Sequence, residues 1–312
     1  MRAVTVNPDL PGVAKVGVGQ VAQPRPGRGQ VLVEVRAVGL GAFEKRIAAT
    51  DDPAAVRKLL GSRTVPLGLE FSGVVRSDGD HLRVGQRVMG GPHFTRGERC
   101  LAEYVAVGEE NVALIPDDLD GAAAAALPVA AQTALRSLDA ARVGAGDRVL
   151  VVGAGGGVGV NVVQLAAARG AEVTALASAR ALPLVCELGA AYAHDYRDTA
   201  PADLGVFDAI IDHSGHHTFA GVAAHLTPRG AFVLLEPNKD VPGLARALVS
   251  RRRMPLVYVP QPTRPQLERV LEHVRRGELR PVVDATFDLE HLDEAFTELA
   301  AGSRRGRVVL TL

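Results

Sequence analysis

The stretch VLVVGAGGGVGVNVVQLAAARGAEV, residues 149–173, decides the fold. It reads as an apolar strand, a glycine turn, a helix that runs to about Arg169, and the start of a second strand. The turn holds Gly153, Gly155, Gly156, Gly157, Val158 and Gly159. Glycines let the backbone approach a pyrophosphate, whose charge then lies at the free N–H groups and positive end of the helix. The complete order predicts a dinucleotide-binding unit. The alternative is that the glycines only permit tight packing of helix on sheet.

Further apolar segments follow at the spacing of alternating strands and helices. They are residues 171–178, 207–213, 231–237 and 255–260. Strands that are covered on both faces read as unbroken apolar runs, and helices between them imply right-handed crossovers in a parallel sheet. We therefore expect residues 120–260 to form a doubly wound parallel sheet of the Rossmann type.

The two ends of the chain predict a second domain. Residues 1–119 hold short Val-rich strands bounded by Pro, Gly and Asp, so this part is expected to be mostly β. Residues 261–312 read as a helix, then strand, helix and strand. A terminal strand needs a sheet with a free edge, so we assign residues 261–312 to the same domain as residues 1–119.

Composition excludes several classes of protein. The 312 residues are 47% hydrophobic and 22% charged, with 35 basic against 35 acidic side chains. This balance rules out an unfolded polyelectrolyte and gives no net field that would attract nucleic acid or anionic lipid. Two cysteines, Cys100 and Cys186, cannot build a disulfide framework and suit a reducing compartment. The first residues lack the apolar core of a secretion signal. We expect a cytoplasmic protein with neither nucleic-acid nor membrane partners.

The end of the second strand, about twenty residues past the glycine turn, decides between the two nicotinamide cofactors. An acidic residue there would hold the ribose 2′-hydroxyl of NAD and repel a 2′-phosphate. Ser178 and Arg180 stand there instead, and an arginine binds phosphate through two charge-assisted hydrogen bonds. We therefore expect NADPH. The alternative is that Ser178 caps the next helix and that Arg180 is solvated in its first turn.

Several blocks of the sequence, in their order along the chain, resemble the medium-chain dehydrogenase/reductase superfamily and, within it, the zinc-independent quinone oxidoreductase branch. They include PGRGQVLVEVRAVGL (26–40), LGLEFSGVV (67–75), LRVGQRVMG (82–90), AAALPVAAQTAL (124–135), FDAIIDHSG (207–215) and GRVVL (306–310). The resemblance implies a GroES-like catalytic domain made from both chain ends, with the Rossmann domain inserted between them. It also implies a homodimer joined at the edge of the Rossmann sheet, for which residues 254–260 are the candidate strand.

The resemblance allows a test for zinc. Zinc-dependent relatives carry a Cys after the strand VLVEVRAVG and a His directly before the Glu of the next block, where this sequence has Gly41 and Leu69. Neither side chain offers a lone pair, and catalytic zinc needs three protein ligands. The structural zinc loop of those relatives is also missing. We expect no metal, and we interpret His216 and His217 as loop residues.

The resemblance also indicates residues near the reactive end of the cofactor. Thr133, Ser214 and Asn238 stand in blocks that contact the nicotinamide amide in relatives, and Tyr196 resembles a tyrosine that leans on the adenosine phosphate. Other interpretations stay open, because Thr133 could be satisfied within its helix, Asn238 could form a turn and Tyr196 could pack in the core.

Candidate catalytic residues, besides Thr133, are Phe43, Glu44 and His93. Relatives commonly carry Asn, two residues and then Asp in the loop that corresponds to residues 41–44, so the polarity of this site differs. Proton delivery is open between water, Glu44, His93 and Arg46, and Glu44 could equally be a surface residue paired with a neighbouring base. Phe43 is expected to line an apolar cleft at the domain junction or to pack in the core.

These features predict an NADPH-dependent reductase that transfers hydride to a small quinone or α,β-unsaturated carbonyl without zinc. Such acceptors need little Lewis-acid help, because the transition-state charge spreads onto an enolate or quinol oxygen that N–H or O–H groups can stabilise. Two alternatives remain. One is a specialised enoyl or cyclising reductase of a biosynthetic pathway, and the other is an NADPH-binding protein with little turnover.

Overall fold

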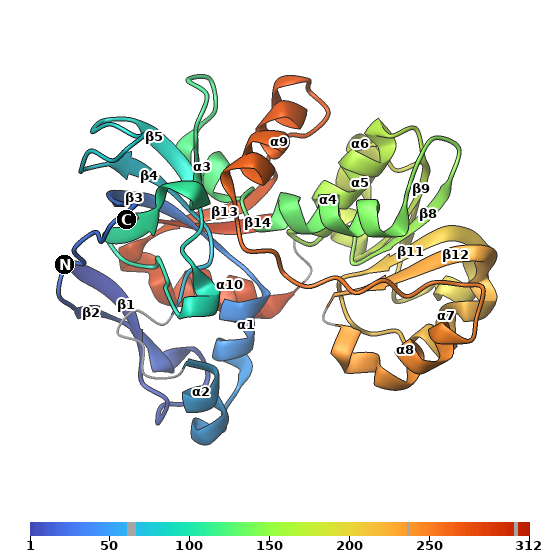
Figure 1. The fold of residues 1–312 in the computed structure, drawn as a ribbon. Helices are drawn as coiled ribbons and strands as arrows, with labels where there is room; N and C mark the ends of the chain where they lie inside the picture. The colour runs from blue at the N-terminus through green and yellow to red at the C-terminus, as the bar shows by residue number, and fades with distance from the viewer. Residues whose placement is uncertain (61–66, 236, 303–304) are drawn as a thin grey trace.

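The computed structural model describes residues 1–60, 67–235, 237–302 and 305–312, which fold into two domains side by side (Figure 1). One domain holds a parallel sheet between two layers of helices. The other is built on a seven-stranded, mostly antiparallel sheet that takes strands from both ends of the chain. The predicted α/β class with a doubly wound parallel sheet is confirmed. Within the described ranges, no helix is long and apolar enough to cross a membrane.

The parallel sheet of the central domain has the strand order β10, β9, β8, β11, β12. The bounds are β8 (Arg148–Val152), β9 (Glu172–Ala177), β10 (Tyr192–Asp195), β11 (Phe207–Asp212) and β12 (Leu226–Leu234). The chain runs from β8 outward to β10 and then returns to place β11 on the other side of β8. Such a reversal leaves a crevice at the carboxyl ends of the two central strands.

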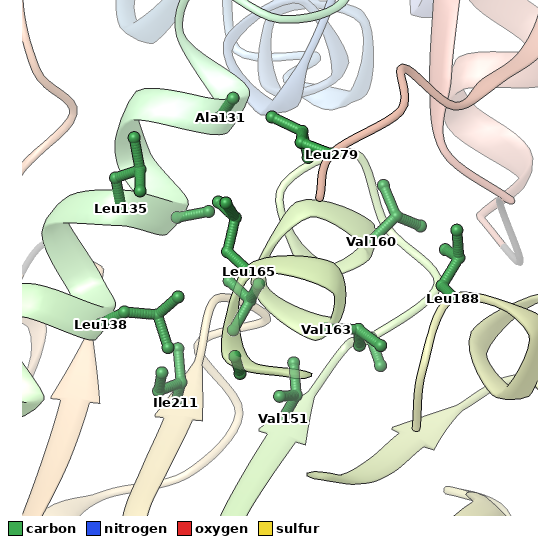
Figure 2. Packing of buried hydrophobic residues seen from close by; sticks show 14 of the residues in the cluster. Ala131, Leu135, Leu138, Val151, Val160, Val163, Leu165, Leu188, Ile211 and Leu279 are labelled. Atoms are coloured by element: carbon green, nitrogen blue, oxygen red, sulfur yellow. The ribbon is translucent and has the colours of Figure 1, made fainter. Parts of the chain in front are cut away.

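Alternate residues of each central strand face opposite layers of helices. Val149 and Val151 belong to the same apolar cluster as α4 and α5, whereas Leu150 and Val152 belong to a cluster with α7. Figure 2 shows Val151 and Ile211 of the sheet beneath Leu138 of α4. The helices are α4 (Ala130–Ala141), α5 (Gly159–Ala168), α6 (Leu182–Glu187), α7 (Phe219–Val222) and α8 (Val241–Leu248). Burial on both faces explains why these strands read as unbroken apolar runs.

The expected sixth strand, residues 255–260, is not a regular strand. Past β12 the chain makes only isolated parallel bridges, Ala231 with Arg253 and Leu235 with Val257. Proline carries no N–H to donate to a ladder, and Pro255 and Pro260 bracket this segment. The prediction of a full strand was therefore wrong, although Val257 is buried against the sheet.

The second sheet has the strand order β13, β14, β3, β4, β5, β7, with β6 paired to β3. The strands are β3 (Gln30–Leu40), β4 (Phe71–Val75), β5 (Arg87–Gly90), β6 (Tyr104–Gly108), β7 (Val112–Leu114), β13 (Val283–Asp288) and β14 (Arg307–Thr311). A hairpin of β1 (Arg2–Val6) and β2 (Val16–Gln20) lies beside it, with α1 (Ala42–Ala49), α2 (Pro53–Leu60), α3 (Gly121–Ala125) and α10 (Leu292–Ala301). The terminal strand β14 pairs antiparallel with β3, which supplies the free edge that a C-terminal strand requires.

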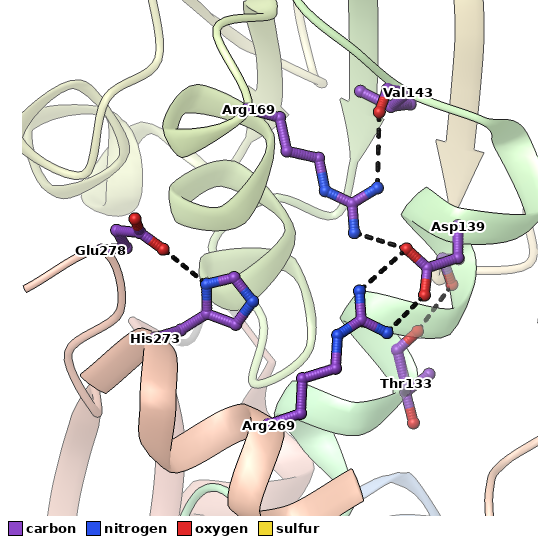
Figure 3. A network of polar contacts seen from close by, with 8 residues as sticks. Thr133, Asp139, Val143, Arg169, Arg269, His273 and Glu278 are labelled. Carbon is purple, nitrogen blue, oxygen red and sulfur yellow. Dashed lines mark hydrogen bonds and ion pairs between the residues drawn. The ribbon is translucent and has the colours of Figure 1, made fainter. Parts of the chain in front are cut away.

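Helix α9 (Arg264–Arg275) lies between the two domains. Its residues Leu267, Val270 and Leu271 belong to the apolar cluster that joins the central domain to Met89, Ala113 and Ile115 of the other domain. Figure 3 shows Asp139 of α4 bonded to Arg169 of the central domain and to Arg269 of α9. Helix α9 therefore connects the domains through apolar packing, through Arg269 to Asp139 of the central domain, and through Arg264 to the carbonyl of Glu109 of the other.

Candidate functional site

A cavity of about 510 Å³ lies at the carboxyl ends of the central strands, where the topology places a crevice. Nine of the predicted cofactor residues line it: Gly153, Gly155, Gly156, Gly157, Val158, Gly159, Ser178, Tyr196 and Ser214. Lys45 of α1 and Arg307 of β14 line the same cavity from the other domain. The site is therefore formed by both domains.

Backbone geometry explains why the turn needs glycine. Gly153 has φ +76°, a conformation that side chains with a Cβ rarely adopt. A Cβ on Gly159 would lie 2.2 Å from the carbonyl oxygen of Gly153, so only glycine allows the start of α5 to approach the end of β8. The turn holds its backbone close to the cavity, and the residues present fit a dinucleotide pyrophosphate at the N-terminus of α5.

Arg307 is a functional candidate that sequence reasoning missed. Its guanidinium donates to Glu70, whose carboxylate also accepts the N–H of Val129 at 2.6 Å. Burial raises the pKa of Glu70, and the Arg307 charge opposes that rise. A Cβ on Gly157 would lie 2.8 Å from Arg307 Cδ, and a Cβ on Gly41 would lie 2.8 Å from an Arg307 nitrogen. Glycine at both positions gives this buried cation a place beside the glycine turn.

The domains also touch through the backbone at this point. The N–H of Gly306 donates to the carbonyl of Gly155 at 2.9 Å, next to a bridge between Gly156 and Gly306. Arg307 and Lys45 thus place two cationic side chains at the cavity that the glycine turn lines. Two cations and a helix N-terminus at one cavity suit a ligand with two phosphates.

Asp212, the last residue of β11, organises the turn that follows. Its carboxylate accepts the N–H groups of Ser214, Gly215 and His217 and the Ser214 hydroxyl, and it lies 2.9 Å from His217 Nδ1. Although burial opposes ionisation, these bonds lower the pKa of Asp212 to about 2. The network fixes Ser214 and His217 at the edge of a second cavity of about 700 Å³, which shares Gly153, Tyr196, Ser214 and His216 with the first.

His213 lines the first cavity from its sheet side and was not predicted. Its Nε2 lies 2.8 Å from the Ser137 hydroxyl, which in turn lies 2.8 Å from the carbonyl of Thr133. Because a hydroxyl that donates to a carbonyl can still accept, this geometry favours the tautomer with the proton on Nε2. Burial lowers the pKa of His213 to about 4, so the imidazole is neutral near pH 7.

Two predicted cofactor residues lie away from this cavity. Arg180 follows Ser178 in a short 3-10 helix, Ala179–Ala181, but its guanidinium faces Asp284 and Glu298 of the other domain. Asn238 is exposed in the turn Pro237–Asp240 and is not among the lining residues. Their roles in cofactor binding stay predictions.

The sequence has no acidic residue directly after β9, but an acidic residue of the neighbouring strand β10 lies beside this position. Asp195 ends β10 in register with Ala177, and its carboxylate accepts the N–H groups of Ala179 and Arg197. Both oxygens are thus bonded to the backbone. Ser178 makes no cap hydrogen bond with its side chain, so its hydroxyl remains at the cavity wall.

The candidate catalytic residues divide into two groups. Glu44 is buried in the first turn of α1, where its carboxylate accepts the N–H groups of Gly41 and Gly68. The expected loop at residues 41–44 is thus the capped start of a helix. Thr133 is buried and donates its hydroxyl to the carbonyl of Val129 at 2.7 Å. Both side chains therefore have structural partners.

Phe43, in the first turn of α1, and His93, in the loop before residues 94–96, are both partly exposed. The Arg99 guanidinium stacks 5.3 Å from the Phe43 ring centre and donates to the carbonyl of Phe94. The N–H of His93 is bonded to Glu98 in the same loop. Arg99 thus connects Phe43 to the loop that holds His93, a contact between distant segments that no local sequence pattern indicates.

Comparisons with known proteins agree with this architecture. Residues 27–136 match the alcohol dehydrogenase GroES-like domain, and residues 188–310 match the family described as zinc-binding dehydrogenase. The GroES-like part of the fold prediction is thereby confirmed. The solved quinone oxidoreductase of Coxiella burnetii superposes with a TM-score of 0.87 at 26% identity and covers 100% of this chain and 99% of that one.

Two curated relatives are similar along most of the sequence. A 2-methylene-furan-3-one reductase of Solanum lycopersicum is 33% identical over 308 residues, which cover 93% of this chain and 74% of the relative. An NADPH-dependent alkenal/one oxidoreductase of Arabidopsis thaliana is 30% identical over 302 residues, which cover 90% and 72%. The chain therefore belongs to the medium-chain dehydrogenase/reductase superfamily, in the branch of the quinone and enone reductases.

Proposed function

We propose that this protein is an NADPH-dependent reductase of quinones or α,β-unsaturated carbonyls. The observation that carries the proposal is the cavity at the glycine turn, with Lys45 and Arg307 lining it from the second domain. One of the two relatives described above is named as a reductase of 2-methylene-furan-3-one, and the other as an oxidoreductase of alkenals and enones. Their names support the same acceptor class here.

The residues of the chain act by binding and orientation. The N–H groups of the turn, with Arg307 and Lys45, would hold the two phosphates, and Ser178 and Tyr196, which also line the cavity, would contact the adenosine end. When bound, the nicotinamide supplies the hydride. Thr133 is buried, donates its hydroxyl to Val129 and is not among the residues that line the cavity, so its contact with the nicotinamide amide stays a prediction.

The proposal includes independence from zinc. Gly41 and Leu69 carry no donor atom, and the Glu70 carboxylate is already bonded to Arg307 and Val129. Catalytic zinc needs three protein ligands. We expect a chelator to leave both Tm and turnover unchanged. Stoichiometric zinc in metal analysis of protein prepared without a histidine tag would contradict this part of the proposal.

The acceptor class follows from how the charge of the transition state is stabilised. An enone or quinone develops charge on an oxygen that N–H or O–H donors can hold, whereas a simple ketone depends more on a Lewis acid. Proton delivery by Glu44, His93 or water stays a prediction, as does a contact of Phe43 with the acceptor. For Glu44 the buried bonds to Gly41 and Gly68 favour a structural role.

The test is a turnover panel. Purified protein is mixed with NADPH and with 1,4-quinones, enals and enones, and the loss of reduced nicotinamide is followed, with the matching saturated ketones as controls. We expect turnover on at least one conjugated acceptor and much slower loss with the ketones. Tight NADPH binding without turnover on any acceptor would overturn the proposal and favour a binding protein.

A further inference from the structure

The sequence predicts that Arg180 binds the adenosine 2′-phosphate, yet its guanidinium is outside the lining of the cavity and faces the other domain. Arg180 follows Ser178, which lines the cavity. One guanidinium nitrogen lies 3.8 Å from Asp284 Oδ1, and the other lies 3.7 Å from Glu298 Oε1. Asp284 belongs to β13 and Glu298 to α10. The residue predicted to bind a phosphate therefore already faces two carboxylates.

These ion pairs are loose. Both distances exceed those of a charge-assisted hydrogen bond, about 2.7–2.9 Å, and the Arg180 side chain is 51% exposed. The Glu298 side chain is 33% exposed, and a pair that is solvated on both sides contributes little to stability, whereas the Asp284 side chain is buried. A phosphate that offers two oxygens to one guanidinium makes shorter and stronger bonds. Arg180 can therefore exchange its carboxylate partners for a phosphate at small cost.

Asp284 has a second positively charged neighbour, Arg305, besides Arg180. Its side chain is 1% exposed, and one oxygen accepts the N–H of Arg305 at 3.0 Å. The other oxygen, buried and without a hydrogen bond in the described residues, lies 3.5 Å from Arg305 Nε. When Arg180 leaves, Arg305 remains to balance the buried carboxylate.

We propose that Asp284 and Glu298 compete with the adenosine 2′-phosphate for Arg180 and so limit the preference for NADPH over NADH. This inference rests on the proposed cofactor binding. NADH carries no 2′-phosphate and leaves the pairs intact, whereas NADPH must break them. The two carboxylates are specificity-determining residues that act through Arg180.

The test compares 2′,5′-ADP with 5′-AMP, which differ by the 2′-phosphate alone. Dissociation constants are measured calorimetrically for the parent and for Glu298→Gln and Asp284→Asn. We expect each variant to bind 2′,5′-ADP about threefold more tightly, as release from a half-exposed pair allows, with 5′-AMP unchanged. Glu294→Gln, which removes an exposed charge one turn earlier on α10, is the matched control for the general loss of negative charge.

Two further measurements keep the result interpretable. Adding Arg180→Ala to Glu298→Gln should abolish the gain, because the carboxylate acts through that arginine. If the buried substitution Asp284→Asn prevents folding, Glu298→Gln still tests the competition for Arg180. Unchanged 2′,5′-ADP affinity in Glu298→Gln, or an equal gain in Glu294→Gln, would overturn the inference. A parent that prefers NADH would contradict the proposed NADPH preference alone, since a gain of 2′,5′-ADP binding in Glu298→Gln would still support the competition.

Discussion

At the scale of single residues, the expected preference for NADPH over NADH depends on Arg180. Because an Arg–phosphate contact adds affinity only for the phosphorylated cofactor, we expect NADPH to bind more tightly than NADH by a factor of about ten or more. Replacing Arg180 with Ala should shrink this ratio and leave NADH affinity unchanged. Fluorescence titration with both cofactors measures the ratio, and Arg246→Ala on the exposed face of α8 serves as control. Equal affinities of the parent protein for the two cofactors would contradict the assignment.

Burial of His213 predicts a pH dependence of stability. Its pKa is lowered from 6.5 to about 4, so the unfolded chain binds a proton at a higher pH than the folded one. The contribution is therefore fully present above pH 6.5 and is lost as the pH falls toward 4. We expect the free energy of unfolding to decrease by about 2 kcal/mol between pH 6.5 and about 5.

Urea unfolding at a series of pH values measures this decrease. The His213→Asn variant should lose most of the slope in that interval, whereas His81→Asn at an exposed position should keep it. The pKa of Asp212 is lowered from 3.8 to about 2. This carboxylate therefore changes the free energy of unfolding below pH 3.8, outside the interval in which His213 acts. A slope that is the same in the His213→Asn variant would show that the histidine does not cause it.

At the scale of a single element, the position of α1 depends on the buried side chain of Lys15. Lys15 Nζ donates to the carbonyls of Ile47, Ala48 and Thr50 at the end of α1. The carbonyl of Ile47 also accepts the Thr50 N–H at 3.4 Å, whereas those of Ala48 and Thr50 have no other donor within the described residues. A cation there also suits the negative end of the helix dipole. Because α1 carries Lys45 into the cavity, this contact also positions the site.

Replacing Lys15 with Met keeps most of the apolar volume and leaves the carbonyls of Ala48 and Thr50 without the donor that Lys15 supplies. We expect the free energy of unfolding to drop by about 1–3 kcal/mol, the cost of an unsatisfied buried polar group. Chemical denaturation measures the loss. Lys58→Met on the exposed face of α2 is the matched control and should change stability by less than about 0.5 kcal/mol. Equal effects of the two substitutions would contradict the role of Lys15.

Elements with local signals could be predicted, and those that depend on distant contacts could not. The glycine turn and the strands of the central domain carry their pattern within a few residues, because both faces of the sheet are buried. Arg307 and Glu70 are 237 positions apart, and nothing near either residue indicates the pair. The segment 255–260 misled the prediction because its apolar residues suit a strand while its prolines prevent regular pairing.

At the scale of the whole molecule, exposed apolar residues gather at one edge of the central domain. Leu248 is 88% exposed, Val249 91% and Leu256 60%. They lie beside a cavity lined by α8 and residues 252–256. Next to them, β12 forms the edge of the sheet, covered only by isolated bridges. An apolar sheet edge tends to pair with another chain.

We therefore expect a homodimer in which a second copy covers this edge by twofold symmetry. Light scattering at micromolar concentration should give about twice the 32.7 kDa of one chain. Leu256→Lys should shift the mass toward the monomer, because it places a charge in the contact, whereas Val84→Lys at an exposed position of the other domain should not. Val257 is 2% exposed, so a lysine there would test the fold rather than the contact. A parent mass near that of one chain would mean that Pro255 and Pro260 alone protect the edge.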